Sequence, residues 1–190
     1  MPKGIVVFVV EGHLEQKFLT EICNCGVKVL KLPNGKTVTP FSIAKQVNAQ
    51  ILLVKEPAYV VVLVDREKRP QSSIALEGEI RAELKRLQFN HPFSVHVPDM
   101  MIENWMLADD NALKKYNLDI APENRSEGCH GKAKIIEGFR KNKSKYNEII
   151  DGVPLLKSCS PSIMSANNAS FNRLFSALGP ILKDCHWMKK

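Results

Sequence analysis

The chain has 190 residues, of which 44% are hydrophobic and 25% are charged, so it is long enough and apolar enough to bury the core of a globular domain. No apolar run approaches the ~20 residues that cross a bilayer, and no cleavable signal pattern opens the sequence. These patterns argue against a membrane protein and predict a cytoplasmic one. The formal net charge of +7 favours an anionic partner.

The five cysteines are an odd number at irregular spacing, which is a poor framework for disulfides. We therefore expect reduced thiols. A zinc site assembled from the pairs Cys23 and Cys25, Cys129 and His130, and Cys185 and His186 is disfavoured, because no Cys-x-x-Cys spacing occurs.

The stretch GIVVFVVEGHLE at residues 4–15 predicts a buried strand followed by a helix. Its apolar residues do not alternate with polar ones, as is typical of a strand covered on both faces in a parallel sheet. Ligands of open α/β sheets bind beyond the carboxyl ends of the strands. Glu11 occupies that position, and Gly12 allows the chain to turn beside it.

The same alternation of apolar strand and amphipathic helix continues through the first hundred residues, which predicts an α/β fold with a four-stranded, mostly parallel sheet. The expected strands are residues 4–10, 27–32, 58–64 and 93–97, and the expected helices are residues 14–22, 40–54 and 73–87, with a turn at residues 33–35. The strand at residues 27–32 alternates with lysine and is expected near an edge of the sheet.

After Pro98 the pattern becomes helical and less regular, with expected helices at residues 102–108, 111–116 and 170–182. We therefore divide the chain into an α/β core, residues 1–110, and a helical C-terminal extension, residues 111–190, that packs on the core to give one compact unit. The sequence leaves the oligomeric state open.

Acidic residues follow two of the predicted strands. Glu11 ends the first, and Asp65 and Glu67 follow the strand at residues 58–64. Because the ends of neighbouring parallel strands lie about 5 Å apart, these carboxylates can converge. Converging carboxylates need a compensating cation, and Mg²⁺ prefers oxygen ligands. The alternative is that these acids cap helices or pair with nearby arginines.

Glu11-Gly12 before a helix and Asp65-Arg66-Glu67 after a later buried strand resemble the Toprim domain of topoisomerases, primases and overcoming-lysogenization-defect nucleases. That domain carries a glutamate and an Asp-x-Asp in the same order. The segments MIENWMLAD at residues 101–109 and ASFNRLF at residues 169–175 look like a stand-alone Toprim-like family of bacterial proteins of unknown function, some of them encoded beside ATPases in defence loci. This second likeness covers nearly the whole chain.

The resemblance implies a Toprim-like, Rossmann-like core with Glu11, Asp65 and Glu67 as catalytic residues. Glu11 acts as a general acid or base, and all three are candidate ligands of Mg²⁺ or Mn²⁺, chiefly Asp65 and Glu67. Glu67 stands where the family usually has Asp, so its side chain is longer by one methylene. Glu15, one helical turn beyond Glu11, and Glu103, after the fourth strand, are further candidate metal ligands. A solvated first-turn acid is the alternative for Glu15. Asp109 is better explained as a helix N-cap.

Basic residues are concentrated between positions 125 and 145, with seven Lys or Arg against two acids. Such a stretch suits contacts with a phosphate backbone, and the alternative is an ordinary solvated surface. The candidate nucleic-acid-binding residues are Arg66, Arg69, Lys132, Lys134, Arg140, Lys141, Lys143 and Lys145.

Two functions are therefore in play. The first is a Mg²⁺-dependent enzyme that cleaves phosphodiester bonds, a nuclease acting on DNA or RNA. The resemblance implies a bacterial defence system and an ATPase partner for it. The second is a non-catalytic Toprim-like module that binds nucleic acid or a partner protein. A requirement for a divalent ion distinguishes them, because only the enzyme needs one.

Overall fold

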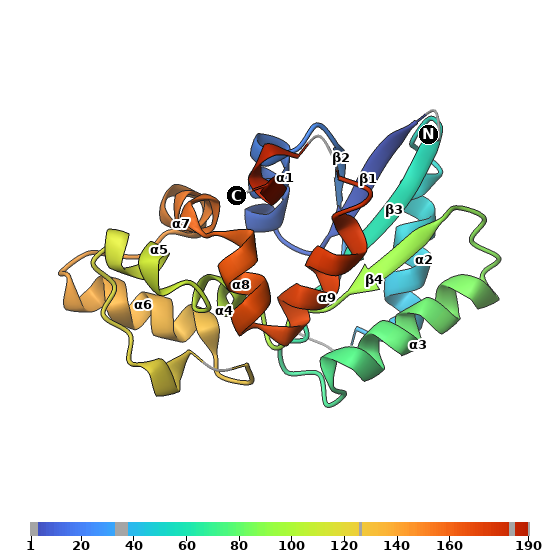
Figure 1. Ribbon diagram of the computed structural model, residues 1–190. Coiled ribbons are helices and arrows are strands. Elements are labelled where there is room, and N and C mark those ends of the chain that lie inside the picture. The colour runs from blue at the N-terminus through green and yellow to red at the C-terminus, as the bar shows by residue number, and fades with distance from the viewer. Residues whose placement is uncertain (1–3, 33–37, 126, 183–184, 190) are drawn as a thin grey trace.

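The structure is a computed structural model that describes residues 4–32, 38–125, 127–182 and 185–189. Its centre is a sheet of four strands, all parallel, in the order β2-β1-β3-β4 (Figure 1). The strands are β1 (Ile5–Val10), β2 (Gly26–Val29), β3 (Pro57–Leu63) and β4 (Phe93–His96). The predicted fold class is confirmed, and the lysine-bearing strand β2 lies at an edge, as expected. The turn predicted at residues 33–35 lies outside the described residues.

The central strands are apolar throughout because both faces of the sheet are covered. Along β1, Phe8 and Val10 face one hydrophobic core, while Val7 and Val9 face a second. The second core is formed with α2 (Pro40–Ile51) and α3 (Ser73–Arg86), and the first with α1 (His13–Ile22) and the C-terminal helices. Figure 1 shows α2 and α3 on one side of the sheet and α1 and α9 on the other.

The helices beside the sheet begin where the sequence predicts them. Thr39 and Ser72 cap α2 and α3, each accepting a hydrogen bond from the backbone amide three residues later. Both helices end earlier than predicted, α2 at Ile51. Leu76, Ile80 and Leu84 of α3 are buried against the sheet, whereas Ile74 in the first turn is 64% exposed.

The C-terminal region is more helical than predicted. It contains α4 (Glu103–Met106), α5 (Asp110–Lys115), η1 (Pro122–Asn124), α6 (Gly131–Lys141), η2 (Glu148–Gly152), α7 (Val153–Ser158), α8 (Pro161–Asn167), α9 (Ala169–Leu178) and η3 (His186–Lys189). Helix α9 stops before Gly179-Pro180 rather than at Leu182. Residues of this region and of the sheet share one hydrophobic core. Among the described residues, no helix is long and apolar enough to cross a membrane.

Ser170, in the first turn of α9, joins the two segments that the sequence singled out after Pro98. Its hydroxyl accepts hydrogen bonds from the indole Nε1 of Trp105, at 3.0 Å, and from the backbone amide of Asp99, at 3.2 Å, and donates to Asn168. Asp109 caps α5, as predicted, and also accepts from the amide of Ser160. These polar side chains therefore fix the C-terminal helices against the end of β4.

Replacing Ser170 with alanine is expected to lower the free energy of unfolding by about 1–3 kcal/mol, because the buried donors of Trp105 and Asp99 would lose their acceptor. Urea unfolding followed by tryptophan fluorescence measures the change. Ser176→Ala, at an exposed serine of the same helix, is the matched control and should change little. Equal effects of the two substitutions would contradict this role for Ser170.

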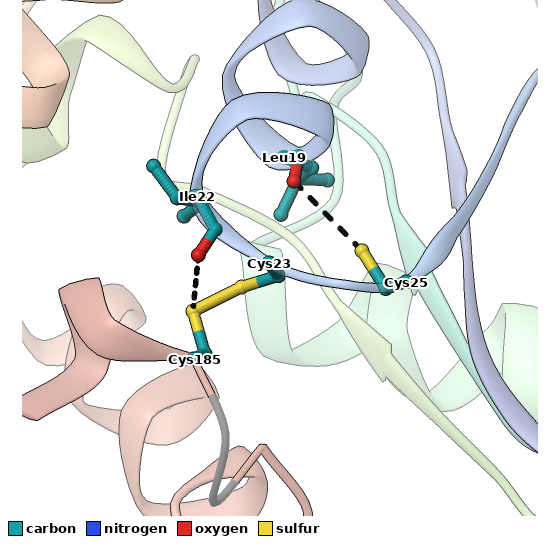
Figure 2. Close-up of a disulfide and its surroundings, with 5 residues drawn as sticks. All are labelled: Leu19, Ile22, Cys23, Cys25 and Cys185. Carbon is teal, nitrogen blue, oxygen red and sulfur yellow. Dashed lines mark hydrogen bonds between the residues drawn. A yellow bond between two sulfur atoms is a disulfide. The ribbon is translucent and has the colours of Figure 1, made fainter.

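The expectation of reduced thiols is wrong for two of the cysteines. Cys23, at the end of α1, forms a disulfide with Cys185 beside η3, 162 residues away, with the Cα atoms 4.7 Å apart (Figure 2). The two residues meet because Trp187 of η3 packs edge-on against Phe18 of α1, at 4.9 Å between ring centroids. Spacing along the sequence could not reveal this pair. Burial raises the pKa of the nearby Cys25 thiol to about 11, so that thiol stays protonated.

Candidate functional site

The site begins where strands β1 and β3 end side by side. Val10 is paired with Leu63 in the sheet, so the residues that follow, Glu11 and Asp65, lie next to each other. The backbone amide of Asp65 donates a hydrogen bond of 3.1 Å to Glu11 Oε2. The predicted convergence of these two strand ends is therefore present in the structure.

Asp65 is the centre of a group of five acids. We call Glu11, Glu15, Asp65, Glu67 and Glu103 the acidic group. Its Oδ1 accepts a hydrogen bond of 3.1 Å from the backbone amide of Ile102, which tethers it to the start of α4. Burial, followed by the charges of Glu15, Glu103, Glu11 and Glu67, raises the pKa of Asp65 well above its ordinary value. All the acids that the sequence nominated therefore lie within electrostatic range of Asp65.

Glu15 and Glu103 are the buried members of this acidic group, although charged residues are seldom buried. Glu15 lies on the face of α1 turned toward the core and is only 5% exposed, and Glu103, the first residue of α4, is 4% exposed. Burial, together with the carboxylates of Glu103 and Glu11, raises the pKa of Glu15 to about 7, against the hydrogen bond from its own backbone amide. The alternative of a solvated Glu15 is wrong.

Glu67 lies at the rim of the site. Its side chain is exposed, its φ of 49° is in the left-handed region, and its amide donates a hydrogen bond of 2.7 Å to the carbonyl of Met100. The charge of Glu67 still contributes to the raised pKa values of Asp65 and Glu11. It belongs to the acidic group electrostatically but is the most accessible of its members.

The two arginines beside the acids are already paired within the protein. Arg69 contacts Glu11 Oε1 at 3.1 Å and also reaches the backbone carbonyl of Asp65. Arg66 contacts Asp99 Oδ1 at 2.8 Å. Both arginine side chains are largely buried. The pair of Arg69 with Glu11 is the pairing that the sequence left open as the alternative, whereas Arg66 pairs with an acid that the sequence did not assign to the site. Although burial raises the pKa of Glu11, the charge of Arg69 opposes that change.

Three residues of the C-terminal region that sequence reasoning did not assign to this site border the acids. Lys132, nominated only as a phosphate contact, forms an ion pair with Glu148 and lies near Glu103 and Asp65. Burial lowers the pKa of Lys132, but the hydrogen bond to Glu148 and the nearby carboxylates raise it overall. The Tyr146 hydroxyl is buried among the same acids. No local pattern marks Glu148 or Tyr146, because only the packing of α6 and η2 brings them here.

The carboxylate oxygens of the acidic group suit a hard cation such as Mg²⁺, but these side chains do not converge on one point. In the part of the chain that the structure describes, no three Asp, Glu, His or Cys side chains are placed to share one metal ion. The acids nonetheless raise one another's pKa, and Glu15 Oε2 is buried without a hydrogen-bond partner among the described residues. A cation would relieve both conditions, and carboxylate oxygens are the ligands that Mg²⁺ prefers.

The remaining candidate nucleic-acid contacts lie on or after α6. Arg140, Lys141, Lys143 and Lys145 are exposed, and Lys134 is half-buried beside Asp119 and Glu137. Lys141 lies 3.7 Å from Glu137, which is a long distance for an ion pair. Because α6 also carries Lys132 and contacts α4, the basic segment and the acidic group are connected through one helix.

Comparison with known proteins gives one match. A family model described as a domain of unknown function, DUF4276, covers residues 10–179. No curated protein and no solved structure matches the chain.

Proposed function

Since this chain belongs to the DUF4276 family of domains of unknown function, we propose its function from the site: it cleaves phosphodiester bonds of DNA or RNA with Mg²⁺ or Mn²⁺. The observation that carries the proposal is the acidic group beyond the carboxyl ends of β1 and β3, in which Glu15 and Glu103 are buried and four carboxylates raise the pKa of the half-buried Asp65. Burying several like charges is costly unless a cation compensates them. The likeness of Glu11 and the Asp65-x-Glu67 motif to Toprim nucleases supports the same chemistry.

Asp65, Glu15 and Glu103 are the residues we propose to hold the ion, and binding would have to draw their side chains together, because no three of the acids that the structure describes are placed to share one ion. Glu67 would contribute its charge from the rim of the site. Asp65 Oδ1 is fixed by Ile102, and Glu15 Oε2 has no competing partner among the described residues. A bound Mg²⁺ would polarise a phosphoryl oxygen and stabilise the negative charge that develops on it. The acids would therefore contribute by holding the ion in place and by balancing its charge.

Glu11 is proposed as the residue that exchanges a proton with the reactants. Hydrolysis adds the oxygen of water to phosphorus and releases the leaving oxygen, which gains a proton, while the attacking water loses one. Both carboxylate oxygens of Glu11 accept hydrogen bonds, from Arg69 and from the amide of Asp65, so its orientation is fixed. Arg69 would also place a positive charge beside the reacting phosphate.

The basic residues at and after the C-terminal end of α6 are proposed to bind the phosphate backbone of nucleic acid without sequence specificity, because positive charge is abundant there. Replacing Lys141, Lys143 and Lys145 together with alanine should weaken binding at low salt and reduce the slope of log affinity against log salt by up to about 3 for duplex DNA. Fluorescence anisotropy over a range of salt concentrations measures both.

The matched control for that triple variant replaces Lys31, Lys45 and Lys55, which are exposed lysines around α2 and remote in sequence from α6. It removes the same charge, so a generic effect of net charge would appear in both variants. If the two triple variants gave the same affinity and the same salt slope, the segment after α6 would be an ordinary solvated surface.

A second candidate function is a non-catalytic module that binds nucleic acid or a partner protein, such as an ATPase. It is favoured by the ion pairs that Arg69 and Arg66 form with Glu11 and Asp99, because these pairs neutralise part of the acidic site without a metal. For either function we propose the cytoplasm as the place of action, although disulfides such as Cys23–Cys185 are rare in that compartment.

Cleavage assays separate the two functions. Single-stranded and double-stranded DNA and RNA, incubated with the full chain and Mg²⁺ or Mn²⁺, should be cut, and EDTA should stop the reaction. A module should bind these substrates equally with and without EDTA and leave them intact. If no nucleic acid is cleaved under any metal condition, and EDTA does not change nucleic-acid binding, the nuclease proposal is wrong and the non-catalytic module is favoured.

A further inference from the structure

Two buried polar atoms of the acidic site have no hydrogen-bond partner among the described residues. They are Glu15 Oε2, on α1, and the hydroxyl oxygen of Tyr146, just before η2. A buried polar group without a partner costs about 1–3 kcal/mol, so native proteins rarely leave such groups unpaired. Two in one site, one able to donate and the other able to accept, call for an explanation.

Each of the two unpartnered atoms, Glu15 Oε2 and the Tyr146 hydroxyl, lies beside a glycine. A Cβ added at Gly12 would come within 2.4 Å of Glu15 Oε2, and a Cβ added at Gly152 would come within 2.4 Å of the Tyr146 hydroxyl. Both distances are shorter than real Cβ contacts, so a side chain at either glycine would displace the polar atom beside it. A Cβ at Gly152 would also lie 3.0 Å from Leu14, the neighbour of Glu15, so η2 lies directly against α1.

The charges around Tyr146 favour its role as a donor. Burial, followed by the carboxylates of Glu103, Glu148, Asp151 and Glu15, raises the pKa of the phenol, which therefore stays protonated near neutral pH. The ring is held by Phe139, whose centroid is 5.3 Å away. Tyr146 thus offers a fixed O–H donor to a group of acceptors that includes Glu15.

We propose that Tyr146 is a positioning residue of this site, whose hydroxyl donates a hydrogen bond to one water molecule that in turn donates a hydrogen bond to Glu15 Oε2. This water bridge orients the Glu15 carboxylate among Asp65 and Glu103. The water bridge itself is independent of the proposed function, whereas its effect on metal binding rests on that function. Water-mediated bonds of this kind are nearly as favourable as direct ones.

A double-mutant cycle on the metal-free protein tests the water bridge. Tyr146→Phe should lower the melting temperature by about 2–4 °C, as expected for the loss of one buried hydrogen bond in a chain of this size. In a Glu15→Met background, where the acceptor is gone, the same substitution should leave the melting temperature unchanged or raise it. A rise on Tyr146→Phe in the wild-type background would show an unpaired hydroxyl and overturn the proposal.

Metal titration distinguishes a positioning role from a merely structural one, because a merely structural role would not change the affinity for Mn²⁺. The Mn²⁺ concentration that gives half of the maximal rise in melting temperature should increase at least about tenfold in Tyr146→Phe, as for other residues that orient metal ligands. Tyr116→Phe, at a tyrosine outside the acidic site, should leave it unchanged. An unchanged value in Tyr146→Phe would overturn the positioning role. If Mn²⁺ does not stabilise even the wild type, the proposed metal function fails, and the metal-free cycle alone decides the inference.

Discussion

Asp65→Asn is expected to abolish divalent-ion-dependent phosphodiester cleavage while leaving the protein folded and at least as stable as the wild type in the absence of metal. Asparagine keeps an oxygen that can accept the hydrogen bond from the amide of Ile102. It removes the charge that would hold Mg²⁺ at the centre of the acidic group. The lost stabilisation of the transition state is worth several kcal/mol, or a rate decrease of at least about a hundredfold.

The expected gain in stability follows from the raised pKa of Asp65. Burial and four neighbouring carboxylates disfavour its ionised form in the folded protein, so the folded state binds its proton more tightly than the unfolded state does. Folding stability therefore falls as the pH rises from the ordinary pKa of an aspartate toward the raised value. A neutral asparagine removes this loss at neutral pH.

Cleavage kinetics and thermal unfolding in EDTA measure the two effects on one preparation. Asp119→Asn, at an exposed aspartate, is the matched control and should alter neither. If Asp65→Asn melts lower than the wild type, Asp65 is a structural anchor for α4 rather than a strained metal ligand. If it melts higher but still cleaves, the catalytic group lies elsewhere.

Glu15→Gln is expected to weaken the pH dependence of folding stability between about pH 4.5 and 7. The pKa of Glu15 is about 7 in the folded protein against an ordinary value of 4.5. Ionising this carboxyl near neutral pH therefore costs the folded state roughly 3 kcal/mol, with the loss developing between about pH 4.5 and 7. Because glutamine does not ionise, the variant should not lose this part of its folding stability as the pH rises.

Urea unfolding at pH 5 and pH 8 in EDTA measures the difference. The wild type should lose more stability than Glu15→Gln between the two values, and the variant should be the more stable protein at pH 8. Adding Mn²⁺ at pH 8 should restore stability to the wild type, because a bound ion favours the ionised carboxylate. Parallel pH profiles of the two proteins would contradict the burial of an ionisable Glu15.

The sequence alone determined the sheet and the acids at its edge. The apolar runs before Glu11 and Asp65 had no polar alternation, which is possible only for strands covered on both faces. Parallel strands bring their carboxyl ends to one edge, so both acids were expected at that edge, whereas the strand order that makes β1 and β3 neighbours was decided by the tertiary structure. The position of Glu15 one helical turn from Glu11 was enough to nominate it, since helix periodicity places both toward the same end of the strand.

Only the tertiary structure decided what surrounds those acids. Glu148 and Tyr146 join Glu15 and Glu103 because α6 packs against α4 and η2 packs against α1. No local pattern records a contact between segments that are far apart in the sequence. The disulfide between Cys23 and Cys185 depends in the same way on Trp187 packing against Phe18. Periodicity reports which face of a segment is buried, whereas the partner that buries it is chosen by the packing of the whole chain.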